Sequence, residues 1–348
     1  MIGHSMKTQN ILRGAALLTV SLLAACGGSS GSSSSGGGTV PPISSNTCTN
    51  GGTNFPVCAV PGVSQQEVAP TYAIGSNEYE AFTELNRIRK SIGFSVVNQN
   101  RFIDTATENH ANYIQRSFRT GDNFHIEVAG REGFTGQNPF DRMKAAGYTS
   151  ISSGSEVSAA QVGRLSISIL MNAILHRQTL MDESVSDVGM ISTPLNGTII
   201  NFGLSRTTTQ SVKGDFIATY PVDGESDITL THMMENPNPF EGEMDMTVQN
   251  MCTKTSAPIS VMSQTGSKLS VTSFTVREYG AAKDLDVRLL KNGINNNHAV
   301  IVGKEPFKQY QRYEVKFVGK VSGAKTSVDF DVNKTWSFTT GRSLLTCS

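Results

Sequence analysis

The stretch that decides the fold of this chain is residues 123–189. Its landmarks, in chain order, are Asn123-Phe124-His125, Phe134-Thr135-Gly136-Gln137-Asn138-Pro139-Phe140-Asp141-Arg142, Ala145-Ala146-Gly147-Tyr148, Gly154-Ser155-Glu156-Val157, His176-Arg177 and Asp187-Val188-Gly189. Two histidines and one glutamate are spread along it, each beside a structural landmark. We therefore expect function to centre on His125, Glu156 and His176, with the rest of the chain serving as export signal, scaffold or spacer.

Apolar residues at helical spacing predict two helices before this stretch. Ser76 can cap the first helix, and Gly93 suits its end. The second helix carries an apolar stripe between Phe102 and Ile114. His110 falls on that stripe, so we interpret it as a packed core histidine rather than a ligand.

Two more helices are predicted inside the stretch. Asn138-Pro139 is a cap followed by proline at the first helical position, and Gly147 closes that short helix. Residues 166–181 are apolar nearly all round, which predicts one helix that is buried on most sides. Because His176 shares a side with apolar residues of this helix, we expect its side chain to point inward.

Three short strands are predicted next, at 188–191, 198–204 and 216–220. Asn196-Gly197 is a hairpin turn signal between the first two. Helices followed by a small antiparallel sheet are typical of an α+β layered domain.

The ordered set of these motifs resembles the bacterial CAP superfamily, which is named after cysteine-rich secretory, antigen and pathogenesis-related proteins and is also called SCP/TAPS. The resemblance is carried by Leu85-Asn86, Arg89, Gly93, Ala106, His110-Ala111, His125, Phe134-Thr135-Gly136, Arg142, Ala146-Gly147-Tyr148, Glu156, His176-Arg177 and Val188-Gly189. It covers residues 72–220. It implies an α-β-α sandwich with a large open cleft.

In that family the cleft holds two histidines and one or two acidic residues, which bind a divalent ion in some members. The resemblance matches His125 and His176 to the two histidines and Glu156 to the glutamate of a Gly-Glu-Asn motif. This chain departs from that motif, because one residue intervenes and the asparagine is absent. The family's second acid, on the helix before the second histidine, is also absent between residues 159 and 175.

Two neutral imidazoles and a carboxylate suit Zn²⁺ with a water in the open position, and such a water can become a nucleophile. The same side chains can equally form a ligand-binding site or a polar cluster that lines a cleft. No nucleophile-elbow pattern supports a serine triad. We therefore favour binding over catalysis, assign no catalytic residue and leave enzymatic activity open. A divalent metal such as zinc is the candidate cofactor, with His125, Glu156 and His176 as its ligands.

Residues 1–25 have the charge-then-apolar layout of a signal peptide. The sequence Leu23-Ala24-Ala25-Cys26-Gly27 resembles a bacterial lipobox, which implies that Cys26 is diacylated. Ordinary secretion with cleavage after Ala25 is the alternative. Residues 26–71 are rich in Gly and Ser, which is typical of a flexible tether. We therefore expect a lipid anchor in the bacterial envelope, at the outer membrane and facing the periplasm or the exterior.

The remaining cysteines suggest disulfides. With Cys26 set aside, proximity favours Cys48–Cys58, as a small clip in the tether, and Cys252–Cys347. Four cysteines can pair in more than one way, so this pairing is a choice rather than a deduction. Free buried thiols are the alternative, and export favours disulfides.

From residue 221 to 348 the sequence pattern changes to short β-rich runs separated by turns. Strands are predicted at 228–233, 259–262, 269–276, 287–290, 299–302, 313–318, 328–332 and 336–340. Such a series predicts a β-sandwich. Four segments resemble bacterial Ig-like domains, which are often spacers or adhesion units. They are Glu235-Asn236-Pro237-Asn238-Pro239, Glu305-Pro306-Phe307, Arg312-Tyr313-Glu314-Val315 and Trp336-Ser337-Phe338-Thr339-Thr340. The predicted fold is therefore α+β, a CAP-type α-β-α sandwich followed by an all-β Ig-like sandwich.

The charge balance narrows the range of functions that this chain can have. The 29 basic and 29 acidic residues cancel, so no long-range field favours nucleic acid. The leading hypothesis is a lipid-anchored envelope protein whose cleft binds a small-molecule, lipid or envelope ligand, with a divalent metal as a candidate partner. One alternative is a metal-assisted hydrolase acting on peptide or cell-wall material. Another is an adhesion protein that works through the Ig-like domain.

Overall fold

A four-stranded sheet forms the centre of the first part of the chain, in the order β1-β3-β4-β2. Its strands are β1 (Asn98–Gln99), β2 (Ile151–Ala159), β3 (Asp187–Thr193) and β4 (Gly197–Ser205). β1 pairs with β3 in parallel, and the other pairs are antiparallel. The computed structural model describes residues 67–149, 151–205, 216–323 and 329–347. The predicted signal peptide, the lipidation site Cys26 and the Cys48–Cys58 clip lie outside these described residues.

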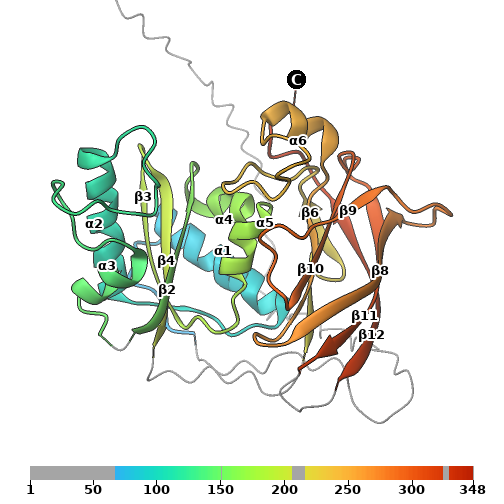
Figure 1. Ribbon diagram of the computed structural model, residues 1–348, viewed down its shortest axis with the longest axis horizontal. Coiled ribbons are helices and arrows are strands. Elements are labelled where there is room, and N and C mark those ends of the chain that lie inside the picture. Colours follow the sequence, from blue (N-terminus) through green and yellow to red (C-terminus); the bar gives the residue numbers. More distant parts are fainter. Residues whose placement is uncertain (1–66, 150, 206–215, 324–328, 348) are drawn as a thin grey trace, which may run out of the picture. The chain divides into compact units, whose positions relative to one another are not determined.

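Helices cover both faces of this sheet, as Figure 1 shows. On one face, α1 (Asn77–Ile92) and α4 (Gly163–Met171) pack against each other and against strands of the sheet. On the other face lie α2 (Arg101–Ser117) and α3 (Pro139–Ala145), which contact β3, β4 and β2. The result is three layers in the order α-β-α, and the predicted α+β class is confirmed.

Local signals set the ends of these elements as predicted. Ser76 Oγ accepts a hydrogen bond from the N–H of Tyr79 at 3.2 Å, and Gly93 ends α1 with φ 90°. Asn138 caps α3, which opens on a proline. Gly197 has φ 66°, a left-handed conformation that glycine adopts readily, in the turn between β3 and β4.

The single helix predicted at 166–181 is wrong, because the segment forms two helices, α4 and α5 (Ile174–Leu180). Asn172 ends α4. Its N–H donates to the carbonyl of Ile169, and its Nδ2 donates to the carbonyl of Ser168 at 2.8 Å. These short-range bonds tighten the last turn of α4 and let a new helix begin. His176 therefore lies in the first turn of α5 rather than deep inside one long helix.

The strand predicted at 216–220 exists as β5 (Ile217–Tyr220), but its assignment to the first sheet is wrong. β5 pairs antiparallel with β7 (Ile259–Ser263) and so belongs to a different sheet. All four of its residues are buried, and α1 also contacts it. Strand periodicity shows that a segment is extended and says nothing about which sheet it joins. The division of the chain into domains at residue 220 stays a prediction.

The rest of the chain forms two further four-stranded sheets, in the orders β5-β7-β10-β9 and β6-β12-β11-β8. Their other strands are β6 (Glu225–Ile228), β8 (Lys268–Glu278), β9 (Val287–Leu289), β10 (His298–Gly303), β11 (Arg312–Ser322) and β12 (Phe330–Thr340). Apolar side chains of both sheets share one core, with Val261 and Ile301 from one sheet and Val315 and Trp336 from the other. Two packed sheets agree with the predicted sandwich, while the Ig-like identity stays a prediction.

Three details of this part differ from the sequence predictions. The strand predicted at 228–233 is wrong beyond Ile228, because the carbonyl of Leu230 accepts N–H groups from Ala257 and Phe307 and the chain leaves the sheet. The strands predicted at 328–332 and 336–340 are parts of one strand, β12. A short helix, α6 (Val248–Lys254), was not predicted.

The layered part and the sandwich are joined by buried contacts. Arg177 of α5 is 1 % exposed. Its guanidinium donates to Ser260 Oγ and to the carbonyl of Pro258, both at 2.9 Å, and it lies 4.7 Å from the ring centre of Tyr220. The apolar core likewise runs without a break from α1 to β12. By their internal contacts, the described residues from 67 to 347 belong to one compact unit.

The predicted disulfide Cys252–Cys347 is confirmed. It joins α6 to the segment after β12, with the two Cα atoms 5.6 Å apart. Within the described ranges, none of the helices has the length and apolar character needed to cross a membrane.

Candidate functional site

His125 follows α2 in a loop, and its ring is held by a strand of the central sheet. Its Nδ1 lies 2.8 Å from Oε1 of Glu156 on β2. The glutamate side chain is fully buried, whereas one third of the histidine side chain is exposed. The structure therefore brings together two of the three residues predicted for the site. We call His125 and Glu156 the first dyad.

Glu156 is held on its other oxygen as well. Oε2 accepts hydrogen bonds from Nη2 of Arg142 at 2.8 Å and from Nδ2 of Asn201 at 2.9 Å. Arg142 also donates from Nη1 to the carbonyl of His125 at 3.1 Å. One guanidinium thus fixes both members of the first dyad, which gives a structural role to an arginine that the sequence marked only as a landmark.

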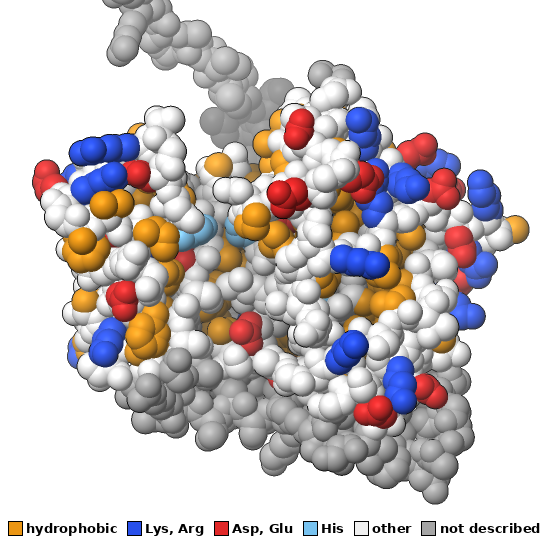
Figure 2. All heavy atoms as spheres, viewed as in Figure 1, with side chains coloured by type: hydrophobic (Ala, Val, Ile, Leu, Met, Phe, Trp, Pro, Cys, Tyr) orange, Lys and Arg blue, Asp and Glu red, His pale blue; other side chains and the backbone are white. Residues whose placement is uncertain are grey.

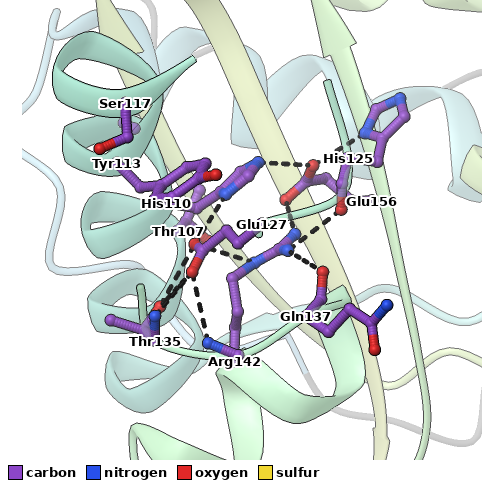
Figure 3. A network of polar contacts seen from close by, with 12 residues as sticks. Thr107, His110, Tyr113, Ser117, His125, Glu127, Thr135, Gln137, Arg142 and Glu156 are labelled. Atoms are coloured by element: carbon purple, nitrogen blue, oxygen red, sulfur yellow. Dashed lines mark hydrogen bonds and ion pairs between the residues drawn. The ribbon is translucent and has the colours of Figure 1, made fainter. Parts of the chain in front are cut away.

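His110 of α2 lies behind the first dyad, and Figure 3 shows its ring facing two carboxylates. Nδ1 is 2.9 Å from Oε1 of Glu127, and Nε2 is 3.0 Å from the carbonyl of Phe124 and 3.4 Å from Oε1 of Glu156. All three neighbours are acceptors, so both ring nitrogens carry protons. Burial alone would lower the pKa of His110, but the hydrogen bonds to Glu127 and Glu156 outweigh it and the pKa is raised.

Glu127 completes this ionic cluster and was missed by the sequence analysis. It accepts N–H groups from Thr135 at 2.6 Å and Gly136 at 3.3 Å, which fixes the Phe134-Thr135-Gly136 landmark. The ionic cluster comprises four buried charged side chains, namely His110, Glu127, Arg142 and Glu156. Two carboxylates balance one imidazolium and one guanidinium. The charges inside the cluster therefore cancel, and His125 donates to the cluster from Nδ1.

The same environment keeps Glu156 ionised. Burial by itself would raise its pKa, yet hydrogen bonds from His110 and His125 and the charges of His110 and Arg142 bring the pKa well below its usual range. Both oxygens of Glu156 are occupied by donors from within the protein. Its role in the folded chain is to orient His125.

His176 is held by a glutamate that the sequence analysis did not select. Its Nδ1 lies 3.0 Å from Oε2 of Glu235, which belongs to the segment after β6. The same oxygen accepts the backbone N–H groups of Leu175 at 2.9 Å and of His176 at 3.3 Å. Glu235 therefore also caps the first turn of α5, where a negative charge is favourable. We call His176 and Glu235 the second dyad.

Glu235 has a further neighbour in His232, a fully buried histidine. Nε2 of His232 lies 3.2 Å from Oε1 of Glu235, a contact that makes an ion pair only if the ring is protonated. Burial would raise the pKa of Glu235, but the hydrogen bond from His176 and the proximity of His232 lower it to about 2. The second dyad thus also places an ionised carboxylate behind a histidine.

Both dyads face one cavity of about 750 Å³. Its lining includes His125, His176, Ser158 and Glu235, and the segments 121–125 and 234–237 form its walls. Figure 2 shows pale-blue histidine side chains at a hollow in the surface. Because each Nδ1 is bonded to a carboxylate, each histidine has only Nε2 left for a ligand.

Local sequence motifs do not reveal Glu235, for a clear reason. The helix before His176 is the place where the resemblance predicts a second acid, whereas Glu235 lies 59 residues after His176. The available signal was the cluster Glu235-Asn236-Pro237-Asn238-Pro239, an acid in a turn-rich segment beside a predicted strand. Nothing in that pattern indicates which helix the turn approaches.

The three predicted metal ligands do not form a single cluster. His125 and Glu156 are paired, His176 is paired with Glu235, and the histidine of each pair lines the same cavity. Among the residues that the structure describes, no group of three or more His, Cys, Asp or Glu side chains has the arrangement of a metal site. The imidazole nitrogens that remain open to a ligand of this cavity are the two Nε2 atoms.

Comparisons with known proteins give little further information. No family model matches the sequence, and neither does any curated protein. One similar solved structure is an outer surface protein of Borrelia burgdorferi, with 14% identity, a TM-score of 0.29 and coverage of 36% of this chain and 89% of that one. Another is an extracellular protein containing an SCP domain from Bacillus anthracis, with 16% identity, a TM-score of 0.31 and coverage of 37% of this chain and 40% of that one. At such scores neither similarity carries an argument about fold or function.

Proposed function

We propose that this chain is a binding protein of the bacterial envelope, and that the cavity between His125 and His176 holds its ligand. The proposal rests on one observation above the others. Two histidines reach the same cavity, and each has its Nδ1 occupied by a buried carboxylate. This arrangement fixes the tautomer and presents two basic Nε2 atoms to whatever enters.

A divalent metal such as zinc is the ligand that these donors fit best. Metal-binding histidines commonly donate their second ring N–H to a carboxylate, which orients the ring and raises its basicity. Here Nε2 of His125 and of His176 would hold the ion, and Glu156 and Glu235 would support them from behind. A bound zinc ion would supply an acidified water and a Lewis acid.

Calorimetry tests the metal proposal directly. Zn²⁺ is titrated into the purified chain and into the double variant His125→Ala/His176→Ala. We expect wild type to bind and the double variant to lose at least about 1.4 kcal/mol, a tenfold weaker affinity. His298→Asn is the control, because His298 lines a different cavity. Identical binding by wild type and the double variant would exclude the metal.

We also propose the envelope location and the CAP identity of the layered part, both from the sequence motifs. Diacylated Cys26 would hold the chain at the membrane, and the Ig-like sandwich would act as a spacer. A Cys26→Ser variant should leave the membrane fraction and lose incorporation of labelled palmitate. If the variant stays in the membrane fraction, another feature anchors the chain.

A metal-assisted hydrolase is the second candidate, favoured by one feature of the first dyad. A neutral imidazole backed by an ionised carboxylate is the arrangement of a general base. Glu156→Gln should turn over peptide or cell-wall material more slowly than wild type. Wild type that has lost activity to a chelator should regain it when metal is added. If wild type turns over nothing across a broad panel of such substrates, binding is left as the function.

A further inference from the structure

A second cavity, of about 600 Å³, is lined by residues of α1, α4 and the segment from β5 to β6. It shares no lining residue with the cavity of the two histidines. Its walls carry four carboxylates and two guanidiniums, from Glu84, Asp223, Glu225, Asp227, Arg87 and Arg164. Negative charge therefore prevails, and an anionic ligand is disfavoured.

Glu225 of β6 is a largely buried carboxylate of this cavity with few close partners. Its side chain is 10% exposed. Oε2 accepts the N–H of Val222 at 3.1 Å, whereas Oε1 has Nη2 of Arg87 at 3.8 Å, beyond hydrogen-bond distance. Burial raises the pKa of Glu225. A positively charged hydrogen-bond donor that binds a carboxylate in this state would stabilise its ionised form.

Arg87 cannot fill that role, because it is committed elsewhere. Its Nε and Nη2 donate to the two oxygens of Glu84 at 3.0 Å and 2.7 Å. This bidentate pair holds the guanidinium against α1. Glu84 therefore compensates most of the charge of Arg87, and Glu225 is left facing the cavity.

Two other side chains of the cavity wall carry oxygens that can accept hydrogen bonds. Asn172 is 5% exposed, and its Nδ2 donates to the carbonyl of Ser168, whereas its buried Oδ1 makes no hydrogen bond with any described residue. Tyr220 is 4% exposed, and the charge of Glu225 acts on its hydroxyl. Buried polar groups are normally satisfied, so the unpartnered Oδ1 of Asn172 indicates a missing partner.

We propose that this cavity binds a primary ammonium group, through Glu225, Asn172 and Tyr220. An ammonium carries one positive charge and three N–H donors, which matches a carboxylate, a carboxamide oxygen and a hydroxyl oxygen. The cavity is within the usual size range of small-ligand sites, about 300 to 1,000 Å³. The ammonium could belong to a lysine side chain of a polypeptide or to a free small amine. The site is distinct from the metal cavity and does not depend on it.

Calorimetry on the full chain with three probes tests the proposal. Pentylamine represents a free amine, and Nα-acetyl-lysine methylamide represents a lysine in a polypeptide. The Nε-trimethyl form of the lysine probe keeps the charge but has no N–H donors. We expect at least one primary amine to bind and the trimethyl form to bind at least about tenfold more weakly. Which primary amine binds more tightly identifies the source of the ammonium.

Glu225→Gln is the decisive variant. Glutamine keeps an acceptor for the N–H of Val222 and removes the charge, so the fold should persist, as thermal unfolding will verify. We expect the preferred amine to bind at least about tenfold more weakly. Tyr220→Phe, which removes one hydroxyl, should weaken binding less.

Two controls separate this site from the rest of the molecule. Glu132→Gln makes the same chemical change on a glutamate whose side chain is 74% exposed and should leave amine binding unchanged. His125→Ala/His176→Ala should also leave it unchanged while abolishing zinc binding, so either site can fail without the other. The proposal is overturned if neither amine binds at millimolar concentration, if the trimethyl probe binds equally well, or if Glu225→Gln binds like wild type.

Discussion

The two dyads reach the same chemical result by different constructions. The first dyad is set in a cluster of charged side chains that all belong to the layered part, with Arg142 bonded to both of its members. The second dyad has no arginine. Its carboxylate is held by backbone N–H groups of α5 and comes from the segment after β6. The balanced charges of the ionic cluster thus orient His125. The approach of the segment after β6 to α5 orients His176.

The largest difference should appear when a charge is removed from the ionic cluster that holds the first dyad. Among the described residues, Arg142→Met leaves His110 as the one remaining cation of the cluster beside buried Glu127 and Glu156. Breaking a buried ion pair from one side typically costs about 3–5 kcal/mol, and we expect a loss of that size in the free energy of unfolding. Urea denaturation measures it.

The control for that prediction is Arg116→Met, on an arginine whose side chain is 58% exposed. It should change the free energy of unfolding by no more than about 0.5 kcal/mol. Equal losses in the two variants would mean that the ionic cluster does not stabilise the fold.

A smaller loss is expected from the second dyad. Glu235→Ala removes the cap of α5 and the partner of His176, which together should cost about 2 kcal/mol. Glu235→Gln keeps an acceptor and should cost about 1 kcal/mol. Both variants should bind zinc more weakly, whereas Glu241→Ala, a change at an exposed position, should match wild type in both assays. Unchanged zinc affinity in Glu235→Ala would mean that His176 does not need this carboxylate.

The pH dependence of stability tests the second dyad further. The pKa of Glu235 is lowered to about 2 in the folded chain, against 4.5 ordinarily. A depressed carboxyl pKa stabilises the fold at pH above the unfolded value, and the contribution is lost as pH falls through the folded value. Wild type should therefore lose more stability than Glu235→Gln between pH 4.5 and 2. Parallel curves of melting temperature against pH would contradict this assignment.

The smallest effect is expected from His110 on the alkaline side. Its pKa is raised above 6.5, so its contribution is full below that value and is lost as pH rises through the folded pKa. His110→Gln should remove this slope while it lowers stability near pH 6. If wild type and His110→Gln respond alike to rising pH, His110 is not the buried cation of the cluster.

Sequence reasoning succeeded where the signal is local. The cap at Ser76, the proline start of α3 and the turn at Gly197 each depend on a few neighbouring residues. The burial of His110 was also predicted, since it follows from an apolar stripe. Its charge was not, because the acceptors around it come from other segments.

The failures concern contacts between segments that are far apart. The apolar run at 166–181 hides a break at Asn172, which side-chain bonds to the preceding turn produce. The strand at β5 was found, but its partner β7 was not. Glu235 was missed for the same reason, since its role depends on where the chain after β6 approaches α5. Three of the four dyad residues could therefore be predicted from motifs, whereas Glu235 and the pairing of the two dyads depend on tertiary packing.

The most direct test is long-range ¹H–¹⁵N correlation of the histidine rings near neutral pH, before and after zinc. The account predicts that His125 and His176 carry a proton on Nδ1, that His110 is protonated at both nitrogens, and that zinc shifts the Nε2 signals of His125 and His176 alone. Finding His125 or His176 protonated at Nε2, or finding both Nε2 signals unmoved by zinc, would contradict it.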